Sequence, residues 1–173
     1  MTNFKEGLAN VKAFIFDIDG VLSLQTISLN VFGVPNRTVN LRDGYALQLA
    51  VKKGYRIGII SGSNSKDYLN RLKQLGIKDI YLNSRNKLGH YKDFRKKYNL
   101  GDNEILFMGD DIPDFEVMKT AGIPACPSDA DSEIRQVSMY ISDKKGGEGC
   151  VRDVIEQVLR LHNNWMDSDA FAW

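Results

Sequence analysis

Short apolar runs alternate with amphipathic segments along most of this chain. The runs are rich in β-prone residues and end at breakers, which predicts buried strands at 13–16, 55–60, 79–82, 104–108, 123–126 and 139–142. Between them, apolar side chains recur every three or four residues, which predicts helices at 43–53, 68–75, 87–98, 113–122, 132–136 and 150–161. Strands separated by helices predict an α/β fold with a doubly wound parallel sheet of the Rossmann-like kind.

The segment after the first strand has a different pattern. Ile27, Leu29 and Val31 alternate with polar residues, and after a turn at 33–36 the alternation resumes as far as Leu41. This pattern predicts a β-hairpin insertion at about 24–41. Because a two-stranded ribbon alone is marginal in water, we expect its apolar face to pack on its own domain or on the same hairpin of other subunits.

The composition indicates one globular domain of ordinary size. The chain has 173 residues, 43% hydrophobic and 26% charged, and we expect a domain at 1–161 followed by a tail at 162–173. A net charge of +1 gives no electrostatic reason to expect nucleic acid or a membrane as partner. Cys126 and Cys150 offer neither a disulfide framework nor a zinc spacing. No apolar run approaches the roughly 20 residues of a membrane span, so a cytoplasmic protein is expected.

Polar side chains follow several of the predicted strands. They are Asp17 and Asp19 after the first strand, Ser61 after the second, and Asp110 and Asp111 after the strand at 104–108. Because the carboxyl ends of parallel strands gather at one edge of such a sheet, these residues are expected to share a single site. Carboxylates held together repel one another unless a cation lies between them, and their oxygen ligands favour a hard divalent ion such as Mg²⁺.

The other half of the expected site is an anion pocket. Ser61 and the backbone N–H groups of Gly62 and Ser63 stand where the next helix is expected to begin, and Lys87 stands at the start of the following helix. Taken singly, each feature has an ordinary structural explanation, such as a turn, a solvated lysine or a helix start. Their order and their common place at strand ends favour a site for phosphoryl transfer.

The order Asp-x-Asp-Gly-Val, Ser-Gly, Lys and Gly-Asp-Asp-x-x-Asp resembles the motifs of the haloacid dehalogenase superfamily of phosphatases, over nearly the whole chain from 13 to about 161. The resemblance implies that Asp17 is the nucleophile that forms an aspartyl-phosphate. It implies that Asp19 is the general acid that protonates the leaving oxygen and then the base that activates water. Ser61, Gly62 and Lys87 would hold the phosphoryl oxygens.

The same resemblance implies Mg²⁺ as the cofactor. Its ligands would be the Asp17 carboxylate, the Asp19 backbone carbonyl and the Asp110 carboxylate. Either Asp111 or Asp114 would support the ion or its loop, and the sequence leaves open which of the two does so.

Only about forty residues separate Asp19 from Ser61, and the predicted hairpin, one helix and one strand use them all. There is no room for the cap domain of many superfamily members. In this the chain resembles one subfamily, the 3-deoxy-D-manno-octulosonate 8-phosphate phosphatases, and the matching stretches are the hairpin, 40–45, 86–88, 109–114 and 146–152. The resemblance implies a phosphorylated sugar acid as substrate, a homotetramer whose neighbouring subunits cover each active site, and a role in lipopolysaccharide synthesis.

Two positions depart from the subfamily's pattern. Ser63 stands where many relatives have an arginine after the glycine of the second motif, and Glu148 stands where many have an arginine between glycines. Because an arginine pairs with a carboxylate through two charge-assisted hydrogen bonds, these departures remove two cations that could bind an anionic substrate. Arg42 and Arg152 are therefore candidates for that contact, beside Ser63 and Glu148 themselves. The sequence leaves open whether the sugar acid has eight or nine carbons.

Two other functions fit parts of the pattern. A phosphatase without a cap could act on a macromolecular phosphoester. A receiver domain of a signalling relay also combines an acidic cluster, a Ser or Thr, a Lys and Mg²⁺. Such a domain, however, carries its phosphoacceptor on a middle strand and its adjacent acidic pair on the first, which is the reverse of the order in this chain.

The tail carries Trp165, Met166, Phe171 and Trp173 among polar residues. So much aromatic surface seldom stays in water without a docking place. We expect the tail to pack against a neighbouring subunit near the substrate.

Overall fold

A single parallel sheet organises the molecule. The computed structural model describes residues 3–172, in which the strands pair in the order β3-β2-β1-β4-β5-β6 and every pairing is parallel. The strands are β1 (Ala13–Phe16), β2 (Arg56–Ile60), β3 (Asp79–Tyr81), β4 (Ile105–Met108), β5 (Ile123–Cys126) and β6 (Tyr140–Ile141). This confirms the predicted doubly wound α/β fold. In the flavodoxin-like order of receiver domains the first strand lies beside the second and third; here β1 lies between β2 and β4.

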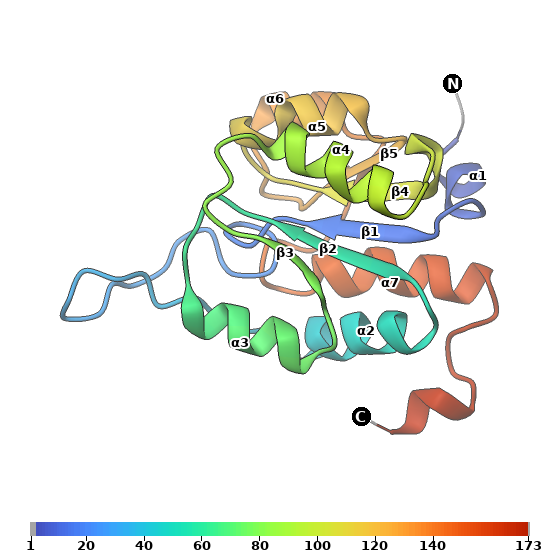
Figure 1. Ribbon diagram of the computed structural model, residues 1–173, viewed down its shortest axis with the longest axis horizontal. Coiled ribbons are helices and arrows are strands. Elements are labelled where there is room, and N and C mark those ends of the chain that lie inside the picture. Colours follow the sequence, from blue (N-terminus) through green and yellow to red (C-terminus); the bar gives the residue numbers. More distant parts are fainter. Residues whose placement is uncertain (1–2, 173) are drawn as a thin grey trace.

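Helices cover both faces of the sheet. The α-helices are α1 (Phe4–Leu8), α2 (Leu41–Lys52), α3 (Lys66–Gln74), α4 (Lys87–Lys97), α5 (Phe115–Thr120), α6 (Ser132–Val137) and α7 (Cys150–Leu161). The 3₁₀ turns of the described residues are η1 (Asp102–Glu104), η2 (Ile112–Asp114) and η3 (Ser168–Phe171). In Figure 1, α2, α3 and α7 lie below the sheet and α4, α5 and α6 above it. No helix in the described part of the chain is long and apolar enough to cross a membrane.

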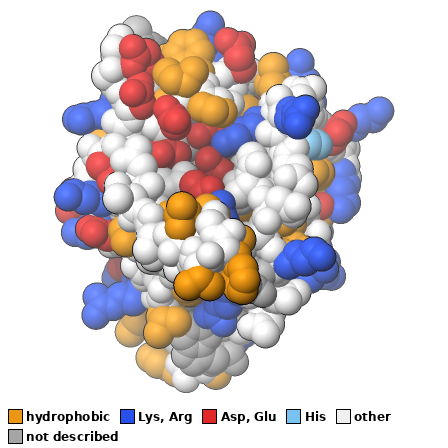
Figure 2. Space-filling model, turned by 90° about the vertical axis from the view of Figure 1, so that its left-hand side faces the viewer, with side chains coloured by type: hydrophobic (Ala, Val, Ile, Leu, Met, Phe, Trp, Pro, Cys, Tyr) orange, Lys and Arg blue, Asp and Glu red, His pale blue; other side chains and the backbone are white. Residues whose placement is uncertain are grey.

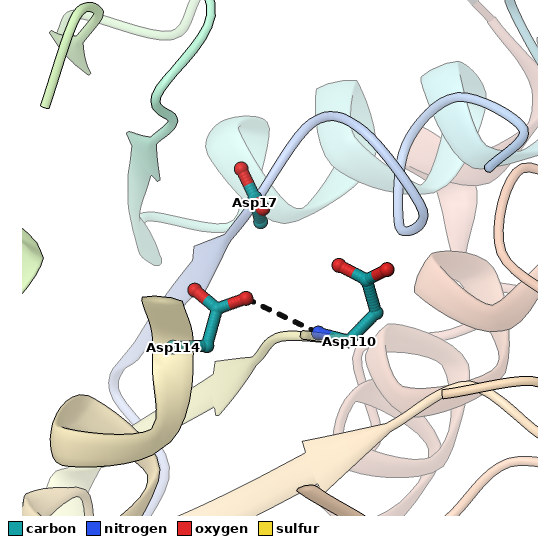
Figure 3. Close-up of side chains that lie close together, drawn as sticks. All are labelled: Asp17, Asp110 and Asp114. Atoms are coloured by element: carbon teal, nitrogen blue, oxygen red, sulfur yellow. Dashed lines mark hydrogen bonds between the residues drawn. The ribbon is translucent and has the colours of Figure 1, made fainter. Parts of the chain in front are cut away.

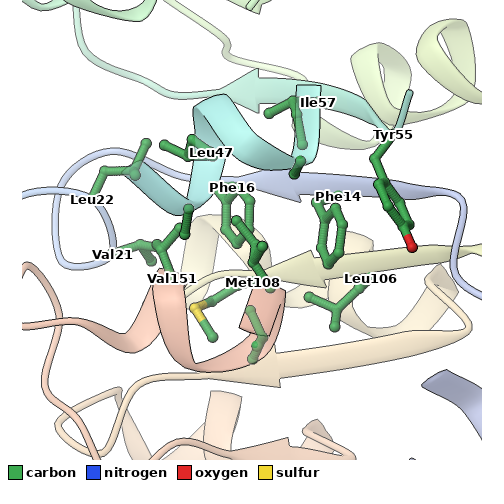
Figure 4. Packing of buried hydrophobic residues seen from close by; sticks show 14 of the residues in the cluster. Phe14, Phe16, Val21, Leu22, Leu47, Tyr55, Ile57, Leu106, Met108 and Val151 are labelled. Atoms are coloured by element: carbon green, nitrogen blue, oxygen red, sulfur yellow. The ribbon is translucent and has the colours of Figure 1, made fainter. Parts of the chain in front are cut away.

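The central strand β1 is buried on both faces. Phe14 and Phe16 pack into the apolar cluster under α2 and α7, where their rings stack with centroids 6.1 Å apart (Figure 4). Ala13 and Ile15 point to the other face, into the cluster that contains Tyr91 and Phe94. Successive side chains of a strand point to opposite faces, so a continuous apolar run suits this position. The residue that follows β1, Asp17, therefore leaves from a fixed point in the core.

The helix after the insertion begins earlier than the sequence predicted. Its N-cap is Asn40, whose side chain accepts hydrogen bonds from the N–H groups of Arg42 and Asp43. Asp43, the first residue of the predicted helix, is instead buried inside the first turn and accepts a hydrogen bond from the Arg152 N–H at 2.7 Å. An asparagine cap satisfies the free N–H groups equally well, and the residue at 43 joins α2 to α7.

The predicted hairpin is present as an arm, residues 24–40, that projects beyond the sheet (Figure 1). Its two halves run antiparallel but make only an isolated bridge, between Leu29 and Pro35. The turn lies at 31–33, because the Asn30 N–H donates to the Val34 carbonyl at 2.9 Å, and not at 33–36 as predicted. Val31 and Phe32 at its tip are 93% and 86% exposed, so the apolar face does not pack on its own domain. No cap domain is present in residues 3–172.

The tail folds back on the same chain. The Tyr45 hydroxyl donates to the Ala170 carbonyl at 2.5 Å, and the Lys53 ammonium pairs with Asp167 and Asp169. Trp165 lies edge-on to the Tyr45 ring. These contacts attach residues up to 172 to α2, and Trp173 lies outside the described residues. Contact of the tail with a neighbouring subunit stays a prediction.

Candidate active site

The candidate site lies at the carboxyl edge of the sheet, where the strand order reverses. Strands β1 and β4 are neighbours, but α2 after β1 and α5 after β4 lie on opposite faces of the sheet (Figure 1). The chain segments that leave such strands diverge, which opens a crevice for a ligand. A pocket of about 690 Å³ lies there. Carboxylates gather around a hollow on this face of the molecule in Figure 2.

Most of the predicted site residues line this one pocket. They are Asp17, Asp19, Ser61, Gly62, Ser63, Lys87, Asp110, Asp111 and Asp114. They come from the ends of β1, β2 and β4, from η2 and from the start of α4. The expectation that strand ends far apart in sequence share one site is therefore met.

A lysine ammonium lies between two carboxylates in the pocket. The Lys87 Nζ donates to Asp17 Oδ2 at 2.9 Å and to Asp114 Oδ1 at 2.8 Å. All three side chains are almost fully buried. Burial by itself lowers the pKa of the lysine, but the charges of Asp17 and Asp114 outweigh it and the pKa is raised. Lys87 is therefore a permanent cation at physiological pH.

Asp110 is placed by the backbone around it. Its N–H donates to Asp114 Oδ2 at 3.2 Å (Figure 3). Its carboxylate lies directly against Gly20, where an added Cβ would be only 1.9 Å from Asp110 Oδ2. Gly20 also has a φ of +80°, a left-handed conformation that residues with a side chain rarely adopt. Only glycine lets the loop after Asp19 pass so close to this carboxylate.

Asp17, Asp110 and Asp114 converge on one another (Figure 3), with one oxygen of each within 4.8 Å of the others. Burial, followed by repulsion from Asp17 and Asp114, raises the pKa of Asp110 to about 8. Burial and then Asp17 raise the pKa of Asp114 to about 6. When all three are ionised, Lys87 offsets only one of the three negative charges. The remaining charge and the oxygen donors fit a hard divalent cation such as Mg²⁺.

The two acidic residues that the sequence could not separate have different surroundings. Asp114 is fully buried, and its two oxygens accept hydrogen bonds from Lys87 and from the Asp110 N–H. Asp111 is exposed and its Oδ1 accepts the Ile112 N–H at 2.8 Å, which caps η2. Asp114 therefore orients Lys87 and Asp110, whereas Asp111 caps η2 and lines the pocket.

Asp19 lies outside the three-carboxylate cluster and pairs with an arginine of the arm. Its Oδ1 and Oδ2 accept hydrogen bonds from Nε and Nη2 of Arg37, at 2.7 and 2.8 Å. The sequence pattern does not point to Arg37, because one arginine in an alternating segment has no characteristic spacing. Gln25, Ser84 and Arg85 also line the pocket and were not singled out. Their only sequence signal is position: Gln25 lies within the arm, and Ser84 and Arg85 come just before Lys87.

The expected anion pocket is formed by a loop and not by a helix start. α3 begins at Lys66 with Ser65 as its N-cap, so Gly62 and Ser63 precede the helix. This corrects the expected position of the helix. The Ser61 hydroxyl accepts the Ser63 N–H and donates to the Ser63 hydroxyl, both at 3.2 Å. Ser61 and Lys87 nevertheless line the same pocket and present hydroxyl and ammonium donors to it.

The glycine-rich segment at 146–149 supports the loop that carries Asp19. A Cβ on Gly146 would lie 1.9 Å from the Gly20 carbonyl oxygen, and the Gly147 N–H donates to the Val21 carbonyl at 2.8 Å. Backbone packs directly on backbone here, which leaves no room for side chains. The segment therefore supports the loop that carries Asp19 through direct backbone contact.

The predicted substrate contacts Arg42, Glu148 and Arg152 lie elsewhere. They line a second pocket, of about 900 Å³. The Arg152 Nε donates to Glu156 at 3.1 Å, and its guanidinium lies 5.1 Å from the centre of the Trp165 ring. Within one chain Arg152 thus anchors the tail. A role for these three residues in substrate binding stays a prediction.

No protein-family model matches this chain. Curated relatives do match it. The 3-deoxy-D-manno-octulosonate 8-phosphate phosphatase of Salmonella typhi is 31% identical over 150 residues, which cover 87% of this chain and 80% of that protein. The enzyme of the same name from Escherichia coli strain K12 matches with the same identity and coverage.

Solved structures agree with this similarity. The phosphatase of the same name from Moraxella catarrhalis, crystallised in complex with magnesium ion, phosphate ion and a KDO molecule, is 33% identical with a TM-score of 0.89, over 97% of this chain and 95% of that one. The enzyme from Yersinia pestis is 28% identical with a TM-score of 0.89, over 93% and 87%. The similarity in sequence and in fold thus extends over most of this chain and of each relative. This protein belongs to the 3-deoxy-D-manno-octulosonate 8-phosphate phosphatase family of the haloacid dehalogenase superfamily.

Proposed function

We propose that this protein is a Mg²⁺-dependent phosphatase that hydrolyses 3-deoxy-D-manno-octulosonate 8-phosphate to the free sugar acid and phosphate. The observation that carries the proposal is the position of Asp17. It follows the buried strand β1, lines the pocket, and has its Oδ2 held 2.9 Å from the Lys87 ammonium. A carboxylate anchored beside a fixed cation is suited to attack a phosphoryl group whose oxygens the cation contacts.

In the first half of the reaction, an Asp17 oxygen forms a bond to phosphorus while the bond from phosphorus to the sugar oxygen breaks. Asp19 gives its proton to that leaving oxygen. Lys87 and the Ser61 hydroxyl hold the phosphoryl oxygens in line for the attack. The products of this half are the free sugar acid and an aspartyl-phosphate on Asp17.

In the second half, water attacks the phosphorus of the aspartyl-phosphate. Asp19, now ionised, takes a proton from that water as the Asp17–phosphate bond breaks. Asp19 is thereby protonated again, phosphate leaves, and Asp17 regains its carboxylate. Two easier displacements replace one difficult hydrolysis.

Mg²⁺ would be held by the carboxylates of Asp17 and Asp110 and by the Asp19 carbonyl, with Asp114 orienting Asp110 and Lys87. The fit rests on the excess of buried negative charge among Asp17, Asp110 and Asp114 and on their all-oxygen donor set. When bound, the ion supplies positive charge for the phosphoryl oxygens of the substrate.

The absence of a cap in residues 3–172 supports a further part of the proposal. An uncapped pocket takes a large substrate or a lid from another subunit, and the exposed apolar tip of the arm favours the second possibility. We propose a homotetramer in which neighbouring subunits cover each site, acting in the cytoplasm in lipopolysaccharide synthesis. The mass of the oligomer by light scattering tests the assembly.

The first experiment is phosphate release with Mg²⁺ from the eight-carbon ester, from the corresponding nine-carbon sugar acid phosphate and from a panel of other sugar phosphates. Fast release from the eight-carbon ester that Asp17→Asn abolishes is expected. A higher kcat/KM on the nine-carbon ester would reassign the substrate and keep the chemistry. Slow but Asp17-dependent release from every sugar would direct the search to macromolecular phosphoesters.

A further inference from the structure

In the same pocket, the Asp19 carboxylate pairs with the Arg37 guanidinium. The Asp19 side chain is 42% exposed, whereas the Arg37 side chain is only 9% exposed. A half-exposed carboxylate on a loop would ordinarily rotate freely. Here two N–H···O bonds, of 2.7 and 2.8 Å, fix both of its oxygens. A bidentate guanidinium pair sets the orientation of a carboxylate as well as its position.

Arg37 is itself held at a fixed place. The next residue, Thr38, donates its N–H to the Ser23 hydroxyl at 2.9 Å, and its own hydroxyl accepts the Leu24 N–H at 2.9 Å. The Ser23 carbonyl in turn accepts the Gly20 N–H at 3.0 Å. Ser23 is fully buried. The base of the arm is thus bonded to the loop that carries Asp19, whatever the exposed tip contacts.

We propose that Arg37 is the positioning residue for Asp19 and sets the place from which Asp19 gives its proton to the leaving oxygen. This inference rests on the proposed function. A general acid must come within about 2.6–3.2 Å of the oxygen that it protonates. In a pocket without a cap domain, the base of the arm holds that acid.

The choice of ester separates positioning from other roles of Arg37. A sugar alkoxide is a poor leaving group, so the first step on a sugar phosphate depends on the proton from Asp19. A nitrophenolate leaves well without a proton, so the same step on p-nitrophenyl phosphate does not. Attack by Asp17 and the contacts of Lys87 are common to both esters. Loss of Arg37 should therefore affect the two esters unequally.

The test compares Arg37→Ala, Arg37→Lys and the wild type on the sugar acid phosphate and on p-nitrophenyl phosphate, in the first turnover and at steady state. Arg37→Ala is expected to slow formation of the sugar acid by about 10- to 100-fold at unchanged KM. This loss is smaller than the full contribution of a general acid, because Asp19 itself remains. Release of nitrophenolate in the first turnover is expected to stay within about 3-fold of the wild type. Arg37→Lys should rescue only partly, because an ammonium cannot make the two-bond pair.

The matched control is Arg95→Ala. Arg95 also pairs with an aspartate, Asp102 at 2.6 Å, but it lies near the far end of α4 and does not line the pocket. This variant is expected to hydrolyse both esters at the wild-type rates. Circular dichroism and the melting temperature show whether each variant is folded, and the Arg37→Lys comparison remains informative if Arg37→Ala is not.

Three outcomes would overturn the positioning role. Equal losses on both esters in the first turnover would place Arg37 at the phosphoryl group or in the fold. A raised KM for the sugar acid phosphate alone, at unchanged kcat, would make Arg37 a substrate contact. Faster turnover of Arg37→Ala would make the pair an inhibitory clamp. If the wild type hydrolyses p-nitrophenyl phosphate and Asp17→Asn does not, the phosphatase function stands in each of these cases; if neither ester is hydrolysed, both proposals fail.

Discussion

Raising the pH in the absence of divalent cations should destabilise this protein through Asp110. Burial, Asp17 and Asp114 raise the pKa of Asp110 from its ordinary value of 3.8 to about 8 in the folded state. Between these two values the folded protein holds a proton that the unfolded chain releases. The contribution of Asp110 to stability is therefore complete below about pH 4 and is lost as the pH rises to about 8.

The size of the effect follows from proton linkage. One proton held only by the folded state changes the free energy of unfolding by about 1.4 kcal/mol per pH unit. From about pH 5 to about pH 7, the metal-free protein is expected to lose roughly 2–3 kcal/mol relative to a variant in which residue 110 cannot ionise. That corresponds to a fall of roughly 5–10 °C in melting temperature for a chain of this size.

The assay is thermal or urea unfolding of the wild type and of Asp110→Asn, with a chelator, at several pH values. The wild type should lose stability with rising pH more steeply than the variant. Mg²⁺ should raise the stability of the wild type most at the higher pH, where the ion does not compete with a proton on Asp110. It should change the stability of the variant little. Parallel pH profiles for the two proteins would refute the claim that Asp110 is held protonated by its buried neighbours.

Three further predictions concern other contacts. Gly20→Ala places a Cβ 1.9 Å from Asp110 Oδ2 at a φ of +80°, and is expected to weaken Mg²⁺ binding at least about 10-fold by titration calorimetry, as outer contacts of metal ligands do; unchanged affinity would show that the loop can move aside. Lys87→Met leaves buried carboxylates without their cation and should cost about 3–5 kcal/mol in urea unfolding, with phosphatase activity lost; a loss below about 1 kcal/mol would contradict the buried pairing. Trp165→Ala removes the ring that lies 5.1 Å from Arg152, so a protease should cut the tail faster, and an unchanged rate would count against this docking.

The sequence by itself determined much of the fold and the chemistry. The bounds of β1, β5 and α7 follow from the apolar pattern and the breakers beside it, because these elements are buried and a buried face tolerates few polar residues. Asp17 and Asp110 could be assigned to one site because parallel strands end at one edge, a rule that needs no side-chain coordinates. The motif order was enough to indicate the superfamily and the subfamily.

Only the tertiary structure decided the finer questions. Asp111 and Asp114 look alike in the sequence, and they differ in the folded chain in burial and in hydrogen-bond partners. The pairing of Arg37 with Asp19 joins residues 18 positions apart through a turn whose place the pattern predicted wrongly. Arg152 resembles a free cation in the sequence, yet Glu156 and Trp165 engage it. Periodicity reports which face of an element is buried, but contacts between side chains depend on how the elements pack, and that information is not local to any segment.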